Sequence, residues 1–81
     1  MYVNLLFFAE LRDLFGVSAT ELTLEPGATV SQAFDRWQIF SGRPVPFGLP
    51  LRFAVNEEYV EAGHILENGD RVALLTPVSG G

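Results

Sequence analysis

The last six residues, Thr76 to Gly81, read TPVSGG and are the part of the sequence best suited to chemistry. Ser79, Gly80 and Gly81 carry almost no side-chain bulk, and glycine lets another chain approach its backbone closely. Pro77 stiffens the base of the segment, and six extended residues reach about 20 Å. Such a tail can thread into a narrow pocket of another protein and present the carboxylate of Gly81 there.

A carboxylate is a poor electrophile, so it must be activated before it reacts, for instance as an acyl-adenylate made from ATP. A sulfur or nitrogen nucleophile can then take the acyl group. We therefore predict a folded domain over residues 1–76 and a flexible C-terminal tail over 77–81, with the reactive carbon at Gly81.

The rest of the chain offers no other catalytic group of residues. The absence of cysteine excludes disulfides, zinc–thiolate sites and cysteine nucleophiles. His64 is the only histidine, and we expect it to be structural or simply exposed. Glu57 and Glu58 fall in a turn and do not form an acid–base pair. Without a glycine-rich phosphate loop or a cluster of metal ligands, we predict neither a metal nor a bound cofactor.

The charge of the chain bears on its partners. Five arginines against ten acidic residues give a net charge of −5, so no basic stripe exists to neutralise phosphates, and nucleic-acid binding is not expected. An acidic domain favours a partner with a basic groove, although the charges can equally serve solvation. The apolar start lacks the features of a signal peptide or membrane span, so we expect a cytoplasmic protein without membrane contact.

Alternation and turn signals predict five strands and two helices. The strands fall at 2–8, 19–25, 52–56, 59–60 and 71–76, and a short helix falls at 9–15. The second helix starts behind Thr29, which with Gln32 has the spacing of a capping box, and ends at Ser41-Gly42. Its apolar stripe consists of Val30, Ala33, Phe34, Trp37 and Phe40. An irregular loop follows at 41–51.

One amphipathic helix can cover only one face of a sheet. The element order therefore indicates an α+β fold of the β-grasp, or ubiquitin-like, type: a mixed sheet with one main helix and a short first helix. In this arrangement the first and last strands lie side by side and parallel at the centre of the sheet.

The face of the sheet that the helix leaves open is predicted to be partly apolar. Side chains alternate along a strand, and Asn4 and Arg71 mark the outward sets of the first and last strands. These sets also contain Leu6, Phe8, Ala73 and Leu75. Exposed apolar patches usually mark contact surfaces. The alternative is that the loop at 41–51 folds over this face and covers it.

Three segments of the chain are recognisable: LLFFAELRDLFG at 5–16, AVNEEYV at 54–60 and LENGDRVALLTPVSGG at 66–81. Together they resemble the family of molybdopterin synthase small subunits, which are ubiquitin-like sulfur carriers. The resemblance implies that the Gly81 carboxylate is adenylated by an E1-like adenylyltransferase using ATP. It further implies conversion to a thiocarboxylate with sulfur from a desulfurase or rhodanese-type donor.

The resemblance also implies a partner. In that family the tail, here Pro77, Val78, Ser79 and Gly80 before Gly81, inserts into the synthase large subunit and donates sulfur to cyclic pyranopterin monophosphate. The family complexes are heterotetramers. Phe8, Arg12 and Leu75 fall at family partner-contact positions, and Phe8 and Leu75 coincide with the apolar patch predicted above.

Three other functions remain open at this stage. The chain could be a sulfur carrier of another pathway, of the thiamine or tungsten-pterin type. It could be a ubiquitin-like modifier whose Gly81 is joined to lysines of target proteins, or a passive interaction domain with an incidental glycine tail.

Overall fold

The structure of the protein is a computed structural model that describes residues 1–46 and 48–76. The elements in chain order are β1 (Tyr2–Phe7), α1 (Ala9–Phe15), β2 (Ala19–Thr23), α2 (Val30–Ser41), β3 (Arg52–Val55), β4 (Glu58–Val60) and β5 (Arg71–Leu75). Each element begins and ends within two residues of the position predicted from the sequence. In the described residues, neither helix is long and apolar enough to cross a membrane.

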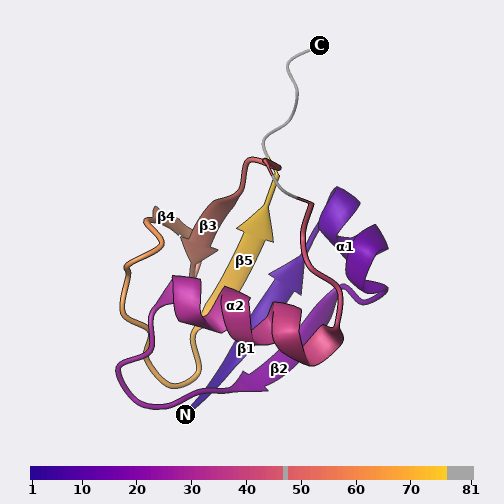
Figure 1. Ribbon diagram of the computed structural model, residues 1–81. Helices are drawn as coiled ribbons and strands as arrows, with labels where there is room; N and C mark the ends of the chain where they lie inside the picture. The colour runs from indigo at the N-terminus through magenta and orange to yellow at the C-terminus, as the bar shows by residue number, and fades with distance from the viewer. Residues whose placement is uncertain (47, 77–81) are drawn as a thin grey trace.

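The strands form a single five-stranded mixed sheet. Its order is β2-β1-β5-β3-β4, with β1 and β5 parallel at the centre and the other neighbours antiparallel. Helix α2 lies across one face of this sheet, and β2 and β4 form its two edges (Figure 1). The predicted α+β, β-grasp architecture is confirmed, including the parallel central pair.

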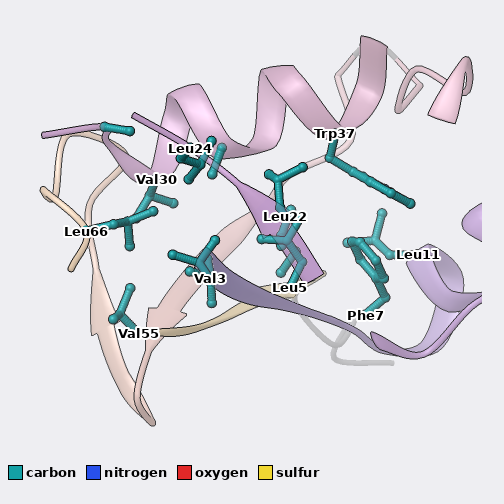
Figure 2. Packing of buried hydrophobic residues seen from close by; sticks show 14 of the residues in the cluster. Val3, Leu5, Phe7, Leu11, Leu22, Leu24, Val30, Trp37, Val55 and Leu66 are labelled. Atoms are coloured by element: carbon teal, nitrogen blue, oxygen red, sulfur yellow. The ribbon is translucent and has the colours of Figure 1, made fainter. Parts of the chain in front are cut away.

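The core lies between α2 and the sheet face that it covers (Figure 2). From the two central strands it takes the predicted inward residues Val3, Leu5, Phe7, Val72 and Leu74, none of which is more than 1% exposed. Helix α1 closes one end of the core with Leu11 and Phe15. The rings of Phe7, Phe15 and Trp37 meet there, with centroids between 4.8 and 5.5 Å apart.

Helix α2 begins with the predicted capping box. The Thr29 hydroxyl accepts the Gln32 N–H at 3.2 Å, and the Thr29 N–H donates to the Gln32 side chain at 2.8 Å. The predicted stripe is wrong at Phe40, whose side chain is 78% exposed. Trp37 already fills the space beneath the last turn, so the Phe40 ring packs on the outside of the indole with centroids 5.9 Å apart.

The start of β5 is fixed by side-chain hydrogen bonds. Asp70 is buried, and its carboxylate accepts from the Asn56 side chain at 2.9 Å and from the Glu67 N–H at 2.8 Å. The Arg71 N–H donates to the Asn56 side-chain oxygen at 3.0 Å. These bonds tie the strand that leads to the tail to the hairpin beside it.

The β3–β4 hairpin turns through only two residues. Val55 pairs with Glu58, which leaves Asn56 and Glu57 as the loop, and both have positive φ, at 50° and 74°. A type I′ turn requires positive φ at both positions, and it favours asparagine followed by glycine. The left-handed backbone therefore suits Asn56 and strains Glu57.

Replacing Glu57 by glycine is expected to stabilise the domain. A side chain in the left-handed region costs about 1 kcal/mol, and glycine avoids this cost. The substitution also removes the ion pair of Glu57 with Arg71, but that pair is exposed and 4.0 Å long, so its loss should matter little. Urea denaturation of Glu57→Gly should give a higher midpoint than the native chain. Glu58→Gly is the matched control, and it should lower the midpoint because Glu58 lies in a strand.

Candidate functional site

The predicted reactive residue lies outside the described residues, as does the rest of the tail. Pro77, Val78, Ser79, Gly80 and Gly81 therefore keep the roles predicted from the sequence, without a structural test. What the structure does describe is the base from which the tail starts, and the sheet face beside it.

The base of the tail is held firmly. β5 pairs with β1 on one side and β3 on the other, so its backbone is fixed up to Leu75. Thr76 follows directly and is half-buried. A tail attached here starts from a strand that is paired on both sides. The number of residues in the tail therefore sets how far Gly81 can extend from the domain.

Two of the four residues of the predicted outer patch, Leu6 and Ala73, lie in one row across the sheet. Leu6 pairs with Ala73, Ala73 with Ala54, and Ala54 with Tyr59. The neighbours of Ala54 along β3 pack on the core, so its side chain faces outward. Sequence reasoning found Leu6 and Ala73 but missed Ala54 and Tyr59, although alternation along the short hairpin pointed to them. Within this row Tyr59 is 74% exposed, Leu6 and Ala73 are half-buried, and Ala54 is buried.

A second row lies next to the tail base. Arg52 of β3 pairs with Leu75, and the parallel register of β1 with β5 brings Phe8 level with Leu75. Phe8 is 47% exposed and Leu75 is half-buried. Arg12 is exposed on α1, one turn after Phe8, whose carbonyl oxygen accepts the Arg12 N–H at 3.4 Å. The strand registers thus place Leu6, Ala73 and Leu75 on the outer face, with Phe8 level with Leu75 and Arg52 as a further neighbour that sequence reasoning missed. The partner-contact roles of these residues and of Arg12 stay predictions.

The loop at 41–51 does not cover this face in the part that the structure describes. Its Val45, Leu49 and Leu51 pack against the core cluster, on the helix-covered side of the sheet. The Arg43 guanidinium donates to the Leu14 carbonyl at 2.9 Å and ties the loop to α1. The side chain of Phe47 lies outside the described residues. Of the two possibilities left open by the sequence, the described residues support the uncovered face.

His64 takes no part in this site. Its side chain is exposed, and its backbone carbonyl accepts the Val30 N–H at 3.0 Å at the start of α2. The structural or exposed role expected for it is confirmed.

The sequence profile of the ThiS family matches residues 5–81, which include both the outer face and the tail. The chain belongs to the ThiS family. The "Molybdopterin synthase sulfur carrier subunit" of Escherichia coli K12 is 33% identical over 87 residues, covering 98% of this chain and 99% of the relative. The family expected from the three recognisable segments is confirmed.

Solved structures of similar shape confirm the fold. SAMP1 from Haloferax volcanii has a TM-score of 0.83 at 23% identity, with all of both chains covered. Subunit 1 in the complex of subunits 1 and 2 of the molybdopterin-converting factor from Helicobacter pylori 26695 is another match. It has a TM-score of 0.61 at 21% identity, again over all of both chains. At these identities the likeness shows a shared β-grasp fold and nothing finer.

Proposed function

We propose that this ThiS-family chain is the sulfur-carrier subunit of a molybdopterin synthase. The observation that carries the proposal is the end-to-end similarity to the E. coli subunit of that name, at 33% identity over 98% of this chain. The matched region runs through the tail to Gly81. The exposed Phe8 ring and the half-buried Leu75 beside the tail base support the proposal, because a carrier must dock before its tail can be positioned.

The proposed chemistry takes place at the carboxyl carbon of Gly81. A carboxylate oxygen attacks the α-phosphorus of ATP, and pyrophosphate leaves. A thiol reductant releases hydrosulfide from the persulfide of the sulfur donor and is itself oxidised to a disulfide. The hydrosulfide attacks the acyl carbon, the bond to the phosphate oxygen breaks, and AMP leaves with the electron pair. The product is a thiocarboxylate, whose sulfur is the nucleophile toward cyclic pyranopterin monophosphate. As the sulfur bonds to the substrate carbon, an oxygen substituent leaves that carbon with its electron pair. Water then cleaves the acyl–sulfur bond, which regenerates the Gly81 carboxylate and leaves the sulfur on the pterin.

Three partners follow from this chemistry. An E1-like adenylyltransferase uses the ATP, a desulfurase or rhodanese-type enzyme supplies the sulfur, and the synthase large subunit holds the substrate. The two outer rows, from Leu6 to Tyr59 and from Phe8 to Arg52, are the proposed docking face. This chain supplies the docking face and the delivery arm, and the enzymes supply the binding sites for ATP and substrate.

The proposal is tested by reconstitution with purified components. The chain is incubated with ATP, an E1-like activating enzyme and a sulfur source, and its intact mass is followed. We expect replacement of one terminal oxygen by sulfur. Mixing the loaded chain with a synthase large subunit and cyclic pyranopterin monophosphate should then return the native mass and yield molybdopterin.

Other outcomes would contradict the proposal in different ways. Sulfur loading without transfer to the pterin would indicate a carrier of another pathway, of the thiamine or tungsten-pterin type. Covalent adducts to lysines of other proteins would indicate a modifier. No change in mass would leave a passive interaction domain.

A further inference from the structure

Among residues 1–46 and 48–76, strand β2 is an edge of the sheet that pairs with a strand on one side only. The Leu24 N–H donates to the Met1 carbonyl at 2.8 Å, and the Phe7 N–H donates to the Ser18 carbonyl at 2.9 Å. Backbone groups of alternate residues in an antiparallel strand point to opposite sides. Those of residues 18, 20, 22 and 24 therefore face β1, and those of Ala19, Glu21 and Thr23 point away from the sheet.

A groove lies between this edge and helix α2. At one end it has a volume of about 500 Å³ and is lined by Glu21, Leu22, Thr23, Arg36, Ile39 and Phe40. Ile39 and Phe40 are 83% and 78% exposed, which is unusual for large apolar side chains side by side. The β2 edge and the last turns of α2 can be followed in Figure 1.

The groove continues toward the start of α2 and becomes acidic. A second hollow of about 350 Å³ shares Arg36 with the first and is also lined by Glu25 and Asp35. This part of the groove thus carries two carboxylates against one guanidinium, and the Glu21 side chain adds a third carboxylate on the opposite face of the same strand edge, where Glu21 pairs with Asn4. A segment that binds here would match the surface if its side chains were apolar toward Ile39 and Phe40 and basic toward the carboxylates.

A second copy of the chain does not meet this description. Glu21 is the middle one of the three residues with outward backbone groups, so a two-fold pairing of two β2 edges centred there sets Glu21 against Glu21. Like charges directly opposite each other destabilise a pair of strands. Each copy also carries a net charge of −5.

We propose that the β2 edge and the groove beside it bind an extended, basic and apolar segment of another protein, which adds a sixth strand to the sheet. The occupant's apolar side chains contact Ile39 and Phe40, and its basic side chains face Glu21. Main-chain hydrogen bonds to an open edge supply affinity, and alternate side chains supply specificity. The groove beside α2 lies on the opposite face of the sheet from the outer rows, whereas Glu21 shares their face, since it pairs with the outward-facing Asn4. The proposal does not depend on the proposed function.

The test uses the full chain, labelled with ¹⁵N, and a capped seven-residue peptide of alternating valine and lysine. Without peptide, the amide protons of Ala19, Glu21 and Thr23 should exchange rapidly with solvent, while those of Thr20 and Leu22 are protected by β1. Adding the peptide should slow exchange at Ala19, Glu21 and Thr23 and shift the signals of Ile39 and Phe40.

Two control peptides separate strand addition from simple charge attraction. Lysines that face Glu21 must direct their own N–H groups at the β2 edge, so the peptide with N-methylated lysines should bind at least about tenfold more weakly because these hydrogen bonds are lost. A valine–glutamate peptide should also bind more weakly. In Glu21→Arg the preference between the lysine and glutamate peptides should shift toward glutamate by about fivefold or more.

Variants of the protein complete the test. The double substitution Ile39→Ser and Phe40→Ser should weaken binding strongly without unfolding the domain, because both side chains are exposed. Tyr59→Ser is the matched control: it removes an exposed apolar side chain near the other edge and should leave binding unchanged. Unaltered exchange at the three edge amides, or signal shifts confined to Phe8 and Leu75, would overturn the proposal. Protection of the edge amides that grows with protein concentration alone would overturn it in favour of a second copy.

Discussion

Deletion of Gly81 is expected to lower sulfur transfer by at least about 100-fold and to leave the melting temperature unchanged. The shortened chain still ends in a carboxylate, that of Gly80, so the chemical group itself is retained. Its position changes by one residue, about 3.5 Å along an extended chain. A misplacement of about 1 Å at a reacting group can already cost about 100-fold in rate. Because β5 is paired on both sides up to Leu75, the sheet cannot release further residues to restore the lost length.

Two further variants separate the effect of the position of the terminal carboxylate from the effect of side-chain size at the last residue. Gly81→Ala keeps the length and the carboxylate but adds a methyl group, whereas one extra glycine keeps the chemistry and changes the length in the other direction. We expect both the deletion and the extension to fail in transfer assays with the large subunit. Gly81→Ala tests whether the pocket tolerates a side chain. Transfer at the native rate by the deletion variant would contradict the view that the tail measures a fixed distance. A large fall in its melting temperature would show that the terminus is part of the folded core.

The sequence predicted the core and its two faces because local signals were strong. Asn4 and Arg71 each break an apolar strand at an outward position, and alternation then places Val3, Leu5 and Val72 inward. The capping box at Thr29 could be read from spacing alone, since it involves residues three apart. These features depend on neighbours along the chain, and all of them appear in the structure.

Features that depend on distant pairing were harder to predict. The outer row reaches Tyr59 only because β3 pairs with β5, and nothing near Ala54 in the sequence reveals its neighbours. Phe40 continues the helical spacing of the stripe, yet the space it would fill is taken by Trp37 together with Phe7 from β1. Periodicity gives the direction of a side chain, but not whether a partner from another strand has already filled that space.

Phe7 and Phe8 are neighbours in sequence that face opposite sides of the sheet, and replacing each by alanine should have opposite consequences. Phe7 is 1% exposed and packs against Phe15 and Trp37 at centroid distances of 4.8 and 5.4 Å. Loss of such a ring leaves a cavity and costs about 3–5 kcal/mol. A domain of this size has a total free energy of unfolding of about 4–12 kcal/mol. The free energy of unfolding of Phe7→Ala, measured by urea denaturation, should therefore be much lower than that of the native chain. The molecules that remain folded should bind the partner with native affinity, so total binding should fall only in proportion to the unfolded fraction.

Phe8→Ala should keep its fold and lose its partner. The ring is 47% exposed, so its removal should cost about 1 kcal/mol of stability or less. An aromatic side chain at the centre of an interface commonly contributes about 2 kcal/mol or more, so the dissociation constant for the large subunit should rise about thirtyfold. Calorimetric titration of each folded variant against the large subunit measures this directly. Native affinity in Phe8→Ala would remove the outer rows from the docking face. A loss of stability equal to that of Phe7→Ala would mean that Phe8 belongs to the core, and the two faces of β1 could then no longer be assigned separate roles.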